Sequence, residues 1–321
     1  MRRLICAALM WLPLPVAAGT VETVDRHILP GYELFARAAQ DLHLAGCNID
    51  AAQVAYHATY DAWLGISHIA FGPAENRALA ILFWPDPKDR TGRALAQLIA
   101  DRDPIVEVGA EFDQVSVAAR GLMAVERLLY DAADDATPYR CALLGAVTQD
   151  LSKTAAAILA AWQDGFADTL RTAGQTGNTR FRSEREGTQV LYTSLSTGLA
   201  FLHDQRLGRP LGTFDRPRPT RAEARRSGRS LRNVKASLTG LRDLAATLSA
   251  GDAPRTLAAC EAALDRAERL DDPVFAGVAD PVARLRVEAL QRAVRDIQVA
   301  VATEIGASLG VSAGFNALDG D

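Results

Sequence analysis

The spacing of apolar residues constrains this fold most. Through nearly the whole chain they recur every three to four positions, and the alternating pattern of strands is almost absent. Ala, Leu, Arg, Glu and Gln, which all favour helices, fill the long segments. The sequence therefore predicts an all-α protein. Helices are expected over Thr20–Leu44, Asp50–Phe71, Thr91–Asp101, Glu111–Tyr130, Pro138–Arg171, Ser183–Leu207, Thr220–Ser249, Ala253–Leu270 and Pro281–Leu309.

One polar segment divides this helical pattern into two halves. Thr172–Thr179 is rich in Gly, Thr, Gln and Asn, a composition typical of turns and linkers. About four principal helices lie on each side of it. An amphipathic helix must bury its apolar stripe, and four antiparallel helices bury theirs together. We therefore predict two antiparallel four-helix bundles joined near residue 175, an N-terminal one over residues 19–172 and a C-terminal one over residues 183–321.

The first residues have the pattern of an export signal. Arg2 and Arg3 precede an apolar run over Leu4–Val16, and Val16-Ala17-Ala18 is a small-residue cleavage site. This predicts a signal peptide over residues 1–18 and a mature protein in the periplasm or cell envelope. The run is shorter than the roughly 20 residues needed to span a bilayer. No other uncharged stretch is long enough, so no transmembrane span is expected after cleavage.

The charge balance argues against a general affinity for nucleic acid. Loss of Arg2 and Arg3 with the leader leaves 33 basic against 39 acidic side chains. Basic residues do gather in one region, without the interleaved aromatic residues that stack on bases. We interpret this region as a solvated helix face that covers an acidic surface, not as a nucleic-acid site. Its members are Arg216, Arg218, Arg221, Arg225, Arg226, Arg229, Arg232 and Lys235.

Three cysteines remain after the signal peptide. Cys47 follows the first predicted helix and Cys141 begins the fourth, whereas Cys260 lies beyond the linker. In an up-down-up-down bundle the first two positions lie at the same end. In an oxidising compartment an odd number of cysteines favours one disulfide and one thiol. The sequence predicts a Cys47–Cys141 disulfide and a reduced Cys260.

The common catalytic signatures are missing from this chain. It has no Gly-rich phosphate loop, no His-Glu-x-x-His zinc motif and no Gly-x-Ser-x-Gly elbow. His57, Asp61 and His68 share one face of the second predicted helix, and His57 and Asp61 are close enough to share an ion. His68 lies two turns further along. The favoured interpretation of all three is a polar stripe at a seam between helices.

A second candidate lies on the segment that ends at Tyr130. Leu122, Val125 and Leu129 form an apolar face at helical spacing, with Glu126 beside it. A carboxylate buried there needs a cation, a metal or a proton. Gly121 allows another backbone to approach closely. The alternative is a surface Glu126 paired with an arginine of the same helix.

Several short motifs point to a known family when they are taken together. They are Phe71-Gly72-Pro73, Phe83-Trp84-Pro85-Asp86, Arg120-Gly121, Glu126-Arg127-Leu128-Leu129, Tyr139-Arg140-Cys141, Leu309-Gly310-Val311 and Gly314–Asp321. With them the chain resembles the imelysin-like proteins, once classed as insulin-cleaving envelope peptidases. The resemblance covers nearly all of the mature chain. It implies a two-bundle helical fold in the bacterial envelope and, as in some relatives, a link to iron uptake.

The hallmark of that family, Gly-x-His-x-x-Glu, falls on Gly121, Met123 and Glu126, so methionine replaces the histidine. A thioether is a poor ligand for Zn²⁺ or Fe³⁺. A catalytic zinc wants about three protein ligands, which Glu126 cannot supply alone. Peptidase activity is therefore disfavoured.

These observations give one leading functional hypothesis. We expect a non-catalytic periplasmic protein that binds a metal, iron or another divalent or trivalent ion, or a small ligand near the domain interface. It would serve iron acquisition, with an envelope or iron-uptake protein as partner. The expected site comprises Gly121, Glu126, His68 and Asp86, the last three as metal ligands. The alternatives are a structural envelope protein that docks partners, and a metallopeptidase.

Overall fold

The structure is a computed structural model that describes residues 16–108, 112–131 and 137–311. The described residues form α-helices with short 3₁₀ and π segments and contain no β-strand, which confirms the all-α prediction. The helices are α1 (Val16–Thr23), α2 (Leu29–Leu44), α3 (Ile49–Ile66), α4 (Ala78–Ile81), α5 (Arg90–Asp101), α6 (Ile105–Val108), α7 (Gly121–Tyr130), α8 (Pro138–Ala161), α9 (Ala167–Arg171), α10 (Glu184–Phe201), α11 (Gly208–Leu211), α12 (Ser230–Leu248), α13 (Pro254–Glu268), α14 (Pro281–Ala300) and α15 (Ala307–Leu309).

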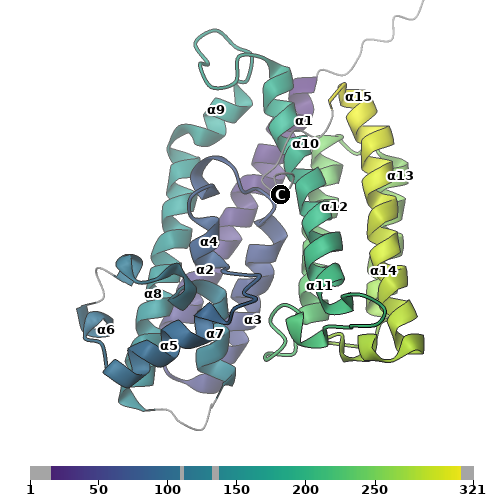
Figure 1. Cartoon of the computed structure of the whole chain (residues 1–321). Coiled ribbons are helices and arrows are strands. Elements are labelled where there is room, and N and C mark those ends of the chain that lie inside the picture. Colours follow the sequence, from purple (N-terminus) through teal and green to yellow (C-terminus); the bar gives the residue numbers. More distant parts are fainter. Residues whose placement is uncertain (1–15, 109–111, 132–136, 312–321) are drawn as a thin grey trace, which may run out of the picture.

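Two groups of helices lie side by side (Figure 1). In the first, α2 packs against α3 and α8, and α7 packs against α8 and α3. In the second, α12 packs against α10 and α13, and α13 packs against α14. The predicted linker falls in the non-helical segment between α9 and α10. One continuous apolar core runs through the described residues of both groups.

The first helix packs against both groups of helices. Residues 16–44 are helical throughout, with a π-helical segment at Val24–Ile28. The part before this segment, α1, packs against α10 and α12, whereas α2 packs against α3 and α8. Because α3 also contacts α12, two elements of the N-terminal half hold the C-terminal half in place.

Local sequence signals account for several helix ends. The Asn48 side chain accepts a hydrogen bond from the Ala51 N–H, and Thr137 accepts one from Arg140, so each caps the helix that follows it. Ser183 caps α10 through Glu186 N, while the Glu186 carboxylate accepts from Arg182 N. These reciprocal bonds fix the start of α10.

Two predicted helices begin later than expected. The helix predicted over Glu111–Tyr130 begins at Gly121, because Gly121 has φ +68° and Arg120 is extended. The helix predicted over Thr220–Ser249 begins at Ser230. Before it the chain forms a 3₁₀ turn at Pro219–Arg221 and further turns. Much of the basic region is therefore a loop and not the face of a helix.

Most of the predicted signal peptide, residues 1–15, lies outside the described residues. None of the helices in the described part of the chain is both long and apolar enough to cross a membrane.

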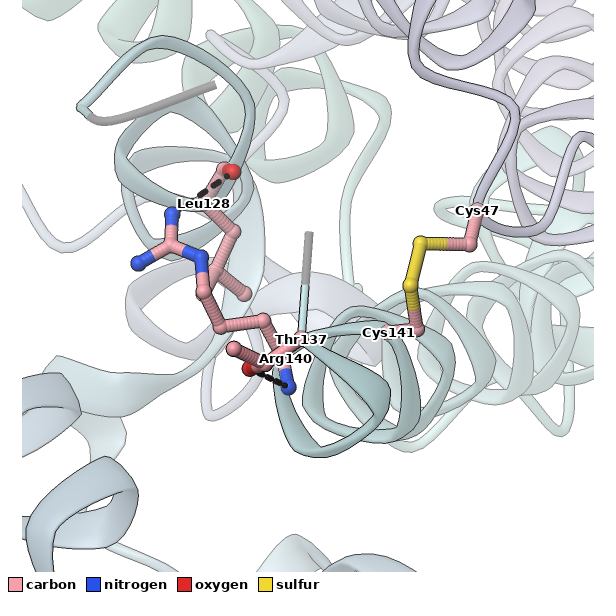
Figure 2. The surroundings of a disulfide bond; sticks show 5 residues. All are labelled: Cys47, Leu128, Thr137, Arg140 and Cys141. Carbon is pink, nitrogen blue, oxygen red and sulfur yellow. Dashed lines mark hydrogen bonds between the residues drawn. A yellow bond between two sulfur atoms is a disulfide. The ribbon is translucent and has the colours of Figure 1, made fainter. Parts of the chain in front are cut away.

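A disulfide links the ends of two long helices. Cys47, just after α2, is bonded to Cys141 in the first turn of α8, with 5.3 Å between their Cα atoms (Figure 2). Next to it, Arg140 Nη2 donates a hydrogen bond to the Leu128 carbonyl at 3.1 Å, which ties α8 to α7. Cys260 is a buried free thiol. The structure thus has the pairing that the topology of an up-and-down bundle predicts.

Candidate functional site

Glu126 is fully buried at the contact between the two halves of the molecule. The apolar face of α7, with Leu122, Val125 and Leu129, packs into the core and fixes the position of Glu126. Its Oε1 accepts two hydrogen bonds from Ser227, one from the backbone N–H at 3.0 Å and one from Oγ at 2.8 Å. Its Oε2 has no hydrogen-bond partner among the described residues. The alternative of a surface carboxylate paired on its own helix is thus wrong.

Burial dominates the ionisation of this carboxyl group. It raises the pKa of Glu126 above the ordinary value and outweighs the two hydrogen bonds from Ser227, which lower it. The protonated form of Glu126 would carry a donor on the oxygen that lacks a partner.

The loop that contacts Glu126 is held in place by its own hydrogen bonds. Ser227 Oγ also lies 3.0 Å from the Ala224 carbonyl oxygen, so its one hydrogen is shared between that oxygen and Glu126 Oε1. Ser230 Oγ donates to the Glu223 carbonyl at 2.6 Å. Arg226 bridges to Asp131 at the end of α7 at 2.7 Å. Sequence reasoning missed Ser227, because it placed this segment on a helix. The only sequence signal was Gly228, which has φ +71° in the structure.

A cavity of about 340 Å³ lies beside Glu126. Asp86 and Met123 line it from the N-terminal half, together with Glu126. Five arginines also line it, four of them on segments of the C-terminal half that precede α12: Arg209, Arg221, Arg225 and Arg226. Hence the structure brings together Glu126 and Asp86 of the expected site, and adds cations that the sequence did not assign to it.

The charges around this cavity do not cancel. Of the five arginines that line it, Arg127 pairs with Asp89 and Asp131, and Arg226 pairs with Asp131. The other three, Arg209, Arg221 and Arg225, make no ion pair within the described ranges. Burial and the nearby charge of Arg221 lower the pKa of Arg209. The cavity therefore carries an excess of positive charge.

Asp86 is not a free metal ligand in this arrangement. Its two oxygens accept hydrogen bonds from the backbone N–H groups of Arg90 and Thr91, at 2.9 and 2.8 Å. Burial alone would raise the pKa of Asp86, but the hydrogen bonds from Thr91 and Arg90 outweigh it and lower that pKa. The carboxylate stabilises the first turn of α5, where N–H groups lack helical partners.

His68 lies away from this cavity. Its Nε2 is 2.8 Å from Nε2 of His27, and both rings are buried. His68 lines a separate cavity together with Trp63 and Ser67. Gly121 packs against the backbone of α4, which is the close approach expected of it, but it does not line the cavity beside Glu126.

The metal site expected from Glu126, Asp86 and His68 is therefore not assembled. Across the residues that the structure describes, no group of three or more His, Cys, Asp or Glu side chains could hold a metal ion. At the position of the family histidine, Met123 Sδ accepts a hydrogen bond from the Tyr60 hydroxyl at 3.6 Å. This donor set does not fit a bound iron or zinc ion.

His57 and Asp61 form the polar seam that their spacing predicts. The buried Arg229 donates to His57 Nδ1 at 3.0 Å and to Asp61 at 2.6 Å, and Arg232 adds a second ion pair to Asp61. Tyr130 lies 3.0 Å from the other ring nitrogen of His57. With these partners the pair joins α3 to α12 and does not share an ion. The basic region thus does cover acidic side chains, as expected.

The buried histidine pair predicts that acid destabilises the protein. Burial lowers the pKa of His27 to about 4, against a smaller opposing effect of Asp243. Burial, with the charges of His27 and Arg206, lowers the pKa of His68 well below 6.5. As the pH falls, these histidines therefore bind protons in the unfolded chain at a higher pH than in the folded chain. The free energy of unfolding falls as the pH drops from about 6.5 towards 4. The slope is about 1.4 kcal/mol per pH unit for each histidine.

Urea denaturation between pH 7 and pH 5 measures this slope. We expect the pH dependence of the free energy of unfolding to become shallower in His68→Gln. It should be unchanged in His203→Gln, which replaces a partly exposed histidine of the C-terminal half. Equal slopes in all three proteins would contradict the assignment to the buried pair.

Comparison with known proteins agrees with this architecture. The family model described as imelysin matches residues 28–301. The curated iron-regulated protein A of Synechococcus elongatus is 26% identical over 233 residues, which are 68% of this chain. The match covers 60% of that relative, so the chain spans about three fifths of its length.

Two solved structures share the fold. An imelysin-like protein of Psychrobacter arcticum superposes with a TM-score of 0.73 at 17% identity, over 94% of this chain and 98% of that one. A putative iron-regulated protein A precursor of Parabacteroides distasonis superposes with a TM-score of 0.74 at 13% identity, over 94% of this chain and 96% of that one. The helical fold and the extent of the family match lead to one conclusion: this chain belongs to the imelysin family.

Proposed function

We propose that this protein is a non-catalytic binding protein of the bacterial cell envelope. Its ligand is a small oxyanion, a molecule with a carboxylate or phosphate group, bound in the cavity beside Glu126. The observation that carries the proposal is the set of three arginines on that cavity, Arg209, Arg221 and Arg225, which have no ion-pair partner within the described part of the chain.

Guanidinium groups recognise carboxylates and phosphates through paired N–H donors. A cavity of about 340 Å³ accommodates a ligand of a few to about a dozen heavy atoms. Of the cations, Arg209 lies on α11, and Arg221 and Arg225 lie on the segment before α12, all in the C-terminal half. Met123 and Glu126 belong to α7 of the N-terminal half. The ligand would therefore bind between the two halves, where small-molecule sites are common.

Glu126 would act as a hydrogen-bond donor at this site. Burial raises its pKa, and Oε2 lacks a partner. The protonated carboxyl group could donate from Oε2 to an anionic ligand while Oε1 continues to accept from Ser227. A carboxylate acting as a metal ligand would instead have to stay ionised, which burial disfavours.

The names of two similar proteins support a connection with iron. With an arginine-rich cavity, the connection would run through an anionic chelate of the ion, such as ferric citrate, and not through the bare ion. The predicted signal peptide supports export to the envelope. Peptidase chemistry finds no support in the described residues, which supply no group of three metal ligands.

Calorimetry of the mature protein with inorganic phosphate, citrate and ferric citrate tests the proposal. We expect Arg209→Gln and Arg221→Gln each to weaken binding of the preferred anion about tenfold or more, because a charge-assisted hydrogen bond contributes about 1.5–3 kcal/mol. Arg286→Gln is the matched control, since Arg286 is an exposed arginine on α14. It should leave the affinity unchanged.

Glu126→Gln separates this proposal from a metal site. The glutamine amide can accept from Ser227 and donate from its nitrogen, so anion binding should stay within about threefold. A metal held by Glu126 would be lost in the same variant. The proposal fails if none of the three anions binds, or if the arginine variants bind as the wild type does.

A further inference from the structure

A second cavity, separate from the one beside Glu126, lies between the two halves of the molecule. It has a volume of about 360 Å³ and an aromatic wall of Trp63, Trp84 and Phe201. Leucines of both halves, such as Leu82 and Leu241, complete the apolar lining. Trp84 is the one residue that it shares with the arginine-lined cavity.

Two buried polar atoms in the lining residues of this cavity have no hydrogen-bond partner. They are the indole Nε1 of Trp63 on α3 and the hydroxyl oxygen of Ser237 on α12. Both residues are almost fully buried, at 2% and 3% exposure. A buried donor without a partner costs roughly 1–3 kcal/mol, so most such groups in proteins are satisfied. Both atoms belong to residues that line one cavity, so a ligand oxygen that reached them would supply the missing acceptor.

The one cation on this cavity is already neutralised. Arg206 Nε donates to Glu223 Oε2 at 2.7 Å, and both side chains are buried. The guanidinium also lies over the Phe201 ring, 4.9 Å from its centroid. An anionic ligand would find no free countercharge there, in contrast to the cavity beside Glu126. The other charged residue of the lining, Glu75, is exposed.

The cavity depends on a glycine in its wall. A Cβ atom on Gly198 of α10 would lie 2.6 Å from Cδ2 of Leu241 and 3.0 Å from Cβ of His68, and all three residues line the cavity. Gly198 thus allows α10, α12 and the segment after α3 to lie close together without filling the space between them.

We propose that this cavity is a second binding site, for an uncharged aromatic molecule of one or two rings that carries an acceptor oxygen. The aromatic wall contacts the rings of the ligand, and Trp63 and Ser237 donate to its oxygen. This site does not depend on the proposed oxyanion site, because its contacts, charge and ligand class all differ.

Prodan provides a probe of this chemistry, because it is a neutral dimethylaminonaphthalene with a propionyl carbonyl. We expect saturable binding at one site per chain, a blue shift of prodan emission, and quenching of tryptophan emission through Trp63 and Trp84. Dimethylaminonaphthalene, which lacks the carbonyl, should bind in the same place without the hydrogen bonds.

Two variants test whether the probe binds in this cavity. Ser237→Ala removes a hydroxyl that has no partner, so the fold should keep its stability or gain slightly. Prodan should bind about 2- to 10-fold more weakly to it, and dimethylaminonaphthalene equally well. Gly198→Leu should abolish binding of both probes by filling the cavity. Its matched control is Gly145→Leu on α8, where a side chain would meet nothing within 4 Å.

Three results would overturn the proposal. Binding that survives Gly198→Leu in a folded protein, or a Ser237→Ala effect that is equal for both probes, overturns the proposal. So does the absence of saturable binding to the wild type. If Gly198→Leu fails to fold, the comparison of the two probes on Ser237→Ala still decides.

Discussion

Replacement of Gly121 by alanine is expected to destabilise the protein by roughly 3–4 kcal/mol, the cost of strain and overpacking combined. Gly121 starts α7 with φ +68°, a conformation that costs a residue with a Cβ atom about 1 kcal/mol or more. A Cβ there would also overlap the carbonyl oxygens of Ala80 and Ile81 on α4. These are backbone atoms, so relief requires α7 and α4 to separate. That movement would open the core around Leu122 and shift Glu126.

Urea denaturation of Gly121→Ala beside the wild type measures this effect. Gly145→Ala is the matched control, because Gly145 has open space around it on α8. There alanine should stabilise by up to about 1 kcal/mol, since it has the higher helix propensity. If both substitutions change the free energy of unfolding alike, the close approach of α7 to α4 does not constrain position 121.

Loss of the Cys47–Cys141 disulfide is expected to lower the free energy of unfolding by roughly 4–5 kcal/mol. The two cysteines are 94 positions apart, and the bond removes the entropy of that loop from the unfolded chain. It also holds the end of α2 against the start of α8, near the Arg140–Leu128 hydrogen bond that reaches α7. Without it the end of the bundle that carries α7 should loosen first.

The double variant Cys47→Ser/Cys141→Ser tests this in urea, with and without a reducing agent. The wild type should lose stability when reduced, and the variant should not respond to the reductant. Because Cys260 is a buried free thiol in both proteins, it does not explain a difference between them. A reduced wild type as stable as the oxidised one would contradict the expected role of the bond.

The sequence alone determined the features that depend on local spacing. The period of the apolar residues predicted the helices, and the positions of Cys47 and Cys141 at helix ends predicted which cysteines meet. The apolar neighbours of Glu126 predicted its burial. Each of these follows from residues a few positions apart, or from the alternation of direction in a bundle. The division into two domains stays a prediction.

The partners of the candidate site residues were decided by tertiary structure. Glu126 accepts hydrogen bonds from Ser227, 101 positions later, and His68 pairs with His27 across 41 positions. Most of the basic region turns out to be a loop with arginines on a cavity, because Gly228 and hydrogen bonds such as Ser230 to Glu223 hold it out of a helix. Helical periodicity says which face of a helix is buried, but it does not say which distant side chain meets that face. That depends on how α7, α12 and the segment before α12 pack together, and on the cost of leaving any buried polar group unpaired.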